Sequence, residues 1–376
     1  MKILKTGSGN RAGSARHRLM TWAMVLLLLS VVPSFGQVDT SVTVQKEEDA
    51  SEEYFSLFEG EDLLEVSLYF DLTKFLKKEE RDQTIDGRMI LHLGETDSLE
   101  RKVTVKYRGQ SRYERCKYPP ARITLKKPLY EGPGSGRIKK IKLVNQCQPG
   151  TTYGDYVIRE YLVYRLYSVV TDTSFRARLI RLTYFDTERK RKPLVQYGML
   201  LEPEGLVESR LNLLEVNTKA VSMRHMLPTM IDRIAIFNYM VSNWDWSVPG
   251  QHNISVFSSP IFEYAGQGIP IPYDFDLAGV VNADYAIPLP ETGLESNRDR
   301  TFLGICRSRE VFESELRLFL SKKEEFYSVI ENSPYLSRGA KKDITVFLDQ
   351  FFDQLEKPRG FERMVDLFLA NCKDFQ

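Results

Sequence analysis

The stretch Val103-Thr104-Val105-Lys106-Tyr107 alternates apolar and polar side chains, which is the pattern of a half-buried β-strand. Similar alternation occurs before it at residues 66–70 and after it at residues 123–125 and 138–143. A turn rich in glycine and proline lies between the last two of these stretches, at residues 132–136. The first half of the chain is therefore predicted to be mostly antiparallel sheet.

One helix is expected within this sheet, over residues 156–170, because apolar side chains recur there at three- and four-residue spacing. Residues 179–185 and 195–201 are expected to form paired strands. The sequence Glu202-Pro203-Glu204-Gly205 follows them, and its proline and glycine indicate a linker.

The second half of the chain is predicted to be mainly helical. Apolar side chains recur with helical spacing at residues 228–241, 311–330, 343–355 and 361–370. The fold class expected from these patterns is α+β with two lobes, a strand-rich N-terminal lobe with one helix and a mainly helical C-terminal lobe. The predicted boundaries are 1–36 for a signal peptide, 37–53 for a flexible linker, 54–202 for the N-terminal lobe and 203–376 for the C-terminal lobe.

The first 36 residues differ from the rest in charge and hydropathy. They contain five basic and no acidic residues, and without them 47 basic residues face 51 acidic ones, a net charge of −4. An apolar run at residues 19–32 precedes the small residues Ser34 and Gly36, a pattern that predicts signal-peptide cleavage before Gln37. An uncleaved anchor helix is the alternative.

The expected location is therefore secreted or periplasmic. After signal removal we expect no membrane span, because no second apolar run is long enough. We also expect no nucleic-acid partner, because a weakly acidic chain has no overall field that attracts phosphate.

Four cysteines follow the signal, and an even number in an exported protein permits two disulfides. Cys116 and Cys147 both lie in the strand-rich half, so theirs is the first bridge predicted. Buried free thiols are the alternative for all four, and the spacings match no zinc pattern.

The densest group of reactive side chains follows the helix predicted at 228–241. It begins Asn243-Trp244-Asp245-Trp246 and ends His252-Asn253, and Asp274-Phe275-Asp276 comes about 20 residues later. Phosphoryl transfer needs oxygen ligands for Mg²⁺ and a carboxylate near the acceptor hydroxyl, and Asp245, Asn253 and Asp274 supply both. The two carboxylates of residues 274 and 276 lie on the same side of an extended chain. Taken singly, each of these residues also fits a turn or a helix cap.

A nucleotide further needs a basic side chain near its α- and β-phosphates, held by a helix acid. Lys142 and Glu160 are the candidates, with Arg122 and Lys126 as rivals for the basic role. A solvated basic strand face is the alternative, because exposed strand edges commonly carry lysine.

These motifs resemble those of the CotH kinases, the spore-coat-type atypical kinases, over about residues 103–288. The resemblance is carried by Arg108-Gly109-Gln110-Ser111-Arg112, the strand at 139–144, Arg159-Glu160, Leu200-Leu201-Glu202, Asn243-Trp244-Asp245-Trp246 with His252-Asn253, and Pro272-Tyr273-Asp274-Phe275-Asp276. It implies that Asp245 is the catalytic-loop aspartate. Asn253 and Asp274 are implied metal ligands, with Asp276 assisting, and Glu202 joins the residues that contact the nucleotide.

The resemblance and the order of the elements together imply a protein-kinase-like fold. The implied activity is an exported kinase that uses ATP with Mg²⁺ or Mn²⁺ and phosphorylates hydroxyl groups of a protein substrate. Arg108 and Arg112 flank a turn glycine and are candidates for phosphate contacts or for pairing with Glu114. Two alternatives stay open: a catalytically silent binding module of the cell envelope, and a metal-dependent hydrolase that uses Asp245, His252, Asp274 and Asp276.

Overall fold

The computed structural model describes residues 55–77, 82–109, 112, 115–132, 136–217, 221–261 and 266–374. The predicted signal peptide and linker lie outside the described residues, as do Gln110, Ser111 and Glu114. Residues Ser51–Gln376 form one compact unit, and everything below concerns this unit.

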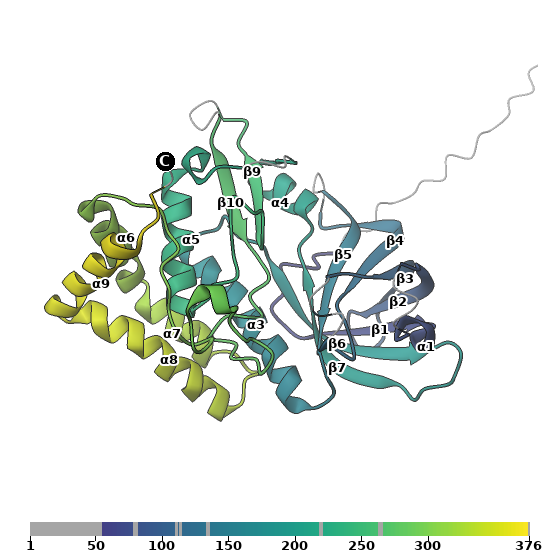
Figure 1. Ribbon diagram of the computed structural model, residues 1–376. Helices are drawn as coiled ribbons and strands as arrows, with labels where there is room; N and C mark the ends of the chain where they lie inside the picture. Colours follow the sequence, from purple (N-terminus) through teal and green to yellow (C-terminus); the bar gives the residue numbers. More distant parts are fainter. Residues whose placement is uncertain are drawn as a thin grey trace, which may run out of the picture. The chain divides into compact units, whose positions relative to one another are not determined.

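The first half of the unit is a closed barrel of seven strands (Figure 1). In chain order they are β1 (Leu64–Phe70), β2 (Ile85–His92), β3 (Ser98–Tyr107), β4 (Ala121–Tyr130), β5 (Arg137–Asn145), β6 (Ala177–Asp186) and β7 (Leu194–Leu201). Around the barrel the order is β1-β2-β3-β4-β5-β7-β6, with antiparallel neighbours except at the closure, where β1 and β6 pair in parallel. Apolar side chains at alternate positions, such as Val105 and Ile123, fill the interior.

The described helices are α1 (Leu72–Phe75), α3 (Thr151–Val170), α4 (Glu204–Leu211), α5 (Pro228–Val241), α6 (Arg309–Ser321), α7 (Lys323–Glu331), α8 (Arg338–Glu356) and α9 (Pro358–Asn371). Short 3₁₀ turns occur at Met223–His225 and Pro290–Thr292. A second, antiparallel sheet has the order β10-β9-β8 and consists of β8 (Leu214–Glu215), β9 (Ile254–Ser258) and β10 (Gly268–Pro272).

The predicted two-lobed kinase-like fold is wrong. The strand-rich half is a closed mixed barrel, and the described residues contain eight α-helices, two of which, α1 and α3, precede β6. The second half is not only helical, because it includes the sheet of β8, β9 and β10. The parallel closure pairs Val66 with Leu182, and the local alternation of side chains does not specify such a distant partner.

Several of the individual strands and helices predicted from the sequence are present in the structure. The alternating stretches around residues 103–107 lie within strands, and the helix expected at 156–170 lies within α3. The helix expected at 311–330 is two helices, α6 and α7, separated at Lys322. The linker expected at 202–205 is wrong in part, because α4 begins at Glu204.

Helix α3 connects the barrel to the helical half. Its buried residues, among them Leu162 and Leu166, share one core with Met199 of β7 and Ile231 of α5. The ring centroids of Tyr167 in α3 and Phe237 in α5 are 4.8 Å apart. The two halves are therefore packed on opposite sides of the same helix (Figure 1).

Two disulfides are present. The predicted bridge between Cys116 and Cys147 is confirmed, with Cα atoms 4.5 Å apart. The second joins Cys306, before α6, to Cys372 at the end of α9. No helix in the described part of the chain has the length and apolar character needed to cross a membrane.

Candidate functional site

The segment after α5 fixes the position of Asp245. The side chain of Asn243 donates from Nδ2 to Asn238 Oδ1 at 2.9 Å, and its own Oδ1 accepts from the Asp245 amide at 3.2 Å. Trp244 and Trp246 on either side are each only 7% exposed. With both indole neighbours buried and its amide bound, Asp245 is held rigidly at the wall of a cavity.

A tight turn brings His252 and Asn253 back to Asp245. Ser247 and His252 exchange two backbone hydrogen bonds of 2.9 Å, so residues 248–251 form the turn. His252 Nε2 then lies 2.8 Å from Asp245 Oδ1. Asn253 donates from Nδ2 to Asp245 Oδ2 at 2.9 Å, and both carboxylate oxygens are thereby oriented.

The pairing of β9 and β10 places Asp274 next to Asn253. Ile254 lies opposite Pro272 in this antiparallel pair, so Asn253 just before β9 and Asp274 just after β10 are neighbours. The amide of Tyr273 donates to Asn253 O at 2.9 Å. The amide of Asp274 donates to the hydroxyl of Tyr164 in α3 at 2.8 Å, which ties the loop to the core.

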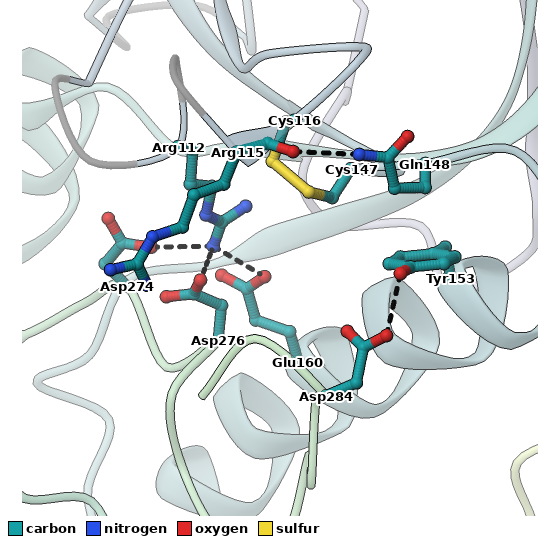
Figure 2. Close-up of a disulfide and its surroundings, with 10 residues drawn as sticks. All are labelled: Arg112, Arg115, Cys116, Cys147, Gln148, Tyr153, Glu160, Asp274, Asp276 and Asp284. Atoms are coloured by element: carbon teal, nitrogen blue, oxygen red, sulfur yellow. Dashed lines mark hydrogen bonds and ion pairs between the residues drawn. A yellow bond between two sulfur atoms is a disulfide. The ribbon is translucent and has the colours of Figure 1, made fainter. Parts of the chain in front are cut away.

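Arg112 joins three acidic side chains from two parts of the chain (Figure 2). Its Nη2 lies 2.6 Å from Asp276, 3.3 Å from Asp274 and 3.5 Å from Glu160 of α3. Burial raises the pKa of Glu160 to about 8 and the pKa of Asp276 to about 6, and the Arg112 guanidinium opposes both shifts. The Arg112 guanidinium thus compensates the negative charge that Asp274 and Asp276 bring to this site.

These groups surround one cavity of about 410 Å³. The barrel contributes Val144 and the adjoining residues Arg108 and Pro120 to its wall. The opposite wall contains Asp245, His252, Asn253, Asp274 and Asp276, and the disulfide residue Cys116 lies at the edge. The cavity therefore lies between the end of the barrel and the β9–β10 pair.

The donor set fits a magnesium ion that takes most of its ligands from phosphate and water. Asp274, Asp276 and the amide oxygen of Asn253 are hard oxygen donors, the type that Mg²⁺ prefers. Asp274 is 29% exposed in its side chain and faces Arg112 through Oδ1. The described residues contain no group of three or more His, Cys, Asp or Glu side chains that could hold a metal ion.

The expected ion pair between Lys142 and Glu160 is not formed. Lys142 Nζ instead contacts Glu204 at the start of α4, and it lies 4.6 Å from the centroid of the Tyr273 ring. The prediction failed because a helix begins where a linker was expected and brings its first carboxylate to β5. Lys142 still lies next to the loop that carries Asp274.

The remaining nucleotide candidates lie outside the cavity wall. Arg122 is exposed on β4, and Lys126 lies 3.5 Å from Asp86 on the barrel surface. Glu202 is buried and accepts two hydrogen bonds from Arg210, at 2.9 and 2.8 Å. Its environment is that of a structural ion pair.

The sequence did not indicate that Arg112 pairs with the acidic side chains of the site. The residue was noted for phosphate contacts or for a partner close in sequence, but its partners come from α3 and the loop after β10. The only local signal was indirect, since two carboxylates at positions 274 and 276 need a nearby cation when buried. Tyr164 and Tyr285, which also adjoin the site, carried no signal in the sequence.

Comparison with known proteins gives little guidance. No family model matches the chain, and no characterised protein does. Among solved structures, it is similar to the Helicobacter pylori proinflammatory kinase CtkA, with 8% sequence identity and a TM-score of 0.35. The match covers 77% of this chain and 90% of that chain. A likeness this weak assigns neither a fold nor an activity.

Proposed function

We propose that this protein transfers a phosphoryl group from a magnesium–nucleotide complex to a hydroxyl group of a protein. The observation that supports the proposal is the convergence of Asp245, Asn253 and Asp274 on one cavity. The first is a carboxylate whose two oxygens are oriented by neighbours, and the other two offer oxygen ligands close beside it. Phosphoryl transfer uses this combination, a carboxylate near the acceptor hydroxyl beside oxygen ligands for Mg²⁺.

Each residue has a distinct role in the proposed step. Asp245 orients the acceptor hydroxyl and takes its proton as the new O–P bond forms and the bond from phosphorus to the nucleoside diphosphate breaks. Asp274, Asp276 and Asn253 would hold the magnesium ion, which neutralises charge on the phosphates when bound. Arg108 and Lys142, beside the same cavity wall and loop, supply positive charge for the remaining phosphate oxygens.

An extracytoplasmic location is part of the proposal. The two disulfides are compatible with it, because disulfides persist in oxidising compartments. The signal peptide itself stays a prediction from residues 1–36.

Two variants separate the proposed roles. Asp274→Ala should abolish magnesium-dependent nucleotide binding, because the phosphates repel one another unless a cation bridges them. Asp245→Ala should bind nucleotide normally but transfer phosphate roughly 10²–10⁴-fold more slowly, the usual contribution of a positioned base. Calorimetry with Mg²⁺ and ATP measures the first effect, and labelled ATP with the protein itself as acceptor measures the second.

Asp97→Ala is a matched control, because it removes an exposed carboxylate from the β2–β3 turn. It should change neither measurement. Equal nucleotide affinity in the wild type and Asp274→Ala would contradict the proposed site. Nucleotide binding without transfer in the wild type would favour the silent binding module.

A further inference from the structure

The barrel surface next to the cavity carries basic side chains on three adjacent strands. Lys106 of β3 lies opposite Arg122 of β4, and Arg122 lies opposite Lys142 of β5. The residues next to them, such as Val105 and Ile123, point into the barrel core. Because side chains alternate along a strand, all three basic side chains point outward.

Lys106, Arg122 and Lys142 form a row across the three strands, and further residues extend this surface on both sides of the row. Toward the cavity, the amide of Arg108 donates to Pro120 O at 3.0 Å, and both residues line the cavity wall. Away from the cavity, the next row on the same face includes Lys140, which lies opposite Thr124. We call the outward side chains the basic face; its members are Lys102, Lys106, Arg122, Lys126, Lys140 and Lys142.

The positive charge of the basic face is only partly compensated. Lys142 is paired with Glu204. Lys106 and Lys126 have one acidic neighbour each, at 3.9 and 3.5 Å, and the partners of these two lysines are highly exposed. Such exposed pairs contribute little. Within the described part of the chain, Lys102, Arg122 and Lys140 form no ion pair. The chain without its first 36 residues has a net charge of −4, so this concentration of positive charge is local.

We infer that the basic face binds an acidic segment of the polypeptide whose hydroxyl group enters the cavity. This inference rests on the proposed function and names the class of substrate. Three strands spaced about 4.8 Å apart give a strip about 10 Å wide, which suits one extended chain. Side chains two residues apart in such a chain repeat every ~7 Å, the same spacing as successive rows of the face.

An extended polypeptide fits this face better than a membrane does. None of the exposed large apolar residues of the described chain, among them Val195, Leu214 and Ile287, lies on β3, β4 or β5. A surface that inserts into lipid combines basic with exposed apolar side chains. Instead, Thr104 and Thr124 lie in the same row as Lys140 and offer hydroxyl groups to a peptide backbone.

The test is a binding measurement that needs no catalysis. The probe is a fluorescent peptide of about twelve residues that alternates Glu and Ala and contains no hydroxyl group. Fluorescence anisotropy should show binding that weakens as ionic strength rises, because charges at an exposed face are screened. The double variant Lys102→Glu/Lys140→Glu should bind the peptide about tenfold or more weakly, since two attractive contacts become repulsive. Neither residue lines the cavity.

The control is Arg359→Glu/Arg363→Glu, the same charge change on two exposed residues of α9. It should leave the peptide affinity unchanged. Equal affinity of the wild type and the Lys102/Lys140 variant would overturn the inference. Tighter binding to vesicles of anionic phospholipid, or to single-stranded nucleic acid, than to the peptide would also overturn it. Because the probe lacks an acceptor, failure of the proposed phosphoryl transfer leaves this result unaffected.

Discussion

Arg112 is the residue on which the acidic side of the cavity depends. It lies within 3.5 Å of Asp274, Asp276 and Glu160, and its side chain is 12% exposed. Removing one partner of a buried charge group costs far more than the group contributes to stability, because the remaining charges lose their compensation. In the proposed reaction, a bound magnesium ion would share this compensating role.

We expect Arg112→Met to lower the free energy of unfolding at neutral pH by about 3–5 kcal/mol. The loss should shrink as the pH is lowered, because burial raises the pKa of Asp276 to about 6 and protonation removes its charge. Mg²⁺ should stabilise the variant more than the wild type. Urea unfolding with and without Mg²⁺ measures both effects.

Arg115→Met is the control, because Arg115 lines the same cavity but is exposed. A variant at Arg112 as stable as the control would show that the three carboxylates do not need this cation.

The sequence indicated Asp245, Asn253 and Asp274 by the type and order of their side chains. In the structure a short turn and one strand pair bring these three residues to the same cavity. The partner of Lys142 was predicted wrongly, because the choice between Glu160 and Glu204 depends on how α3 and α4 pack against the barrel. Contacts of this kind are set by tertiary structure and leave no pattern in a single sequence.

Between elements, α5 is tied to the segment before α6 by one buried ion pair. Asp232 on α5 is 3% exposed in its side chain and accepts a hydrogen bond of 3.1 Å from Arg307 Nε. The neighbouring residue Cys306 is fixed to Cys372 by a disulfide. Burial raises the pKa of Asp232 to about 6, and Arg307 reduces that shift.

This pKa predicts a pH-dependent contribution to stability. An unfolded aspartate has a pKa near 3.9, so the folded state binds the proton more tightly. The resulting stabilisation is complete below about pH 4 and is lost as the pH rises to about 6. Two pKa units correspond to about 3 kcal/mol.

Asp232→Asn should therefore gain up to about 3 kcal/mol relative to the wild type between pH 4 and pH 7, because asparagine does not ionise. Urea unfolding of both proteins across this range gives the difference. If the free energies of unfolding of the two proteins changed in parallel with pH, Arg307 would compensate the charge of the Asp232 carboxylate fully.

Strands and helices were predictable where the side-chain pattern is local and strong. Residues 103–107 alternate cleanly and lie in β3, whereas β2 contains Asp86 and Gly87, which weaken its pattern, and it was not predicted. The break at Lys322 between α6 and α7 interrupts a continuous apolar period and has no proline or glycine to mark it. Closure of the barrel required a pairing between the first and sixth strands, which no local feature specifies.

At the scale of the whole molecule, one hydrophobic core extends across the lobe boundary predicted between residues 202 and 203. Leu166 of α3 and Leu179 of β6 precede residue 203, yet they belong to the same core as Phe237 and Phe275, which follow it. The ring centroids of Tyr164 and Phe275 are 5.0 Å apart across this boundary. The same tyrosine hydroxyl accepts the hydrogen bond from the Asp274 amide, so the site and the core share this contact.

A fragment that ends at residue 202 should therefore not fold cooperatively. It would expose the face of α3 that normally packs against α5, and exposed apolar surface of this kind binds hydrophobic dyes and lacks fixed packing. We expect strong dye fluorescence and a broad thermal transition for residues 37–202, against a single sharp transition for residues 37–376. A sharp transition with little dye binding in the fragment would establish 54–202 as an independent domain. In that case the packing of Tyr164 and Tyr167 across the boundary would serve to position Asp274 and would not be needed to complete the fold.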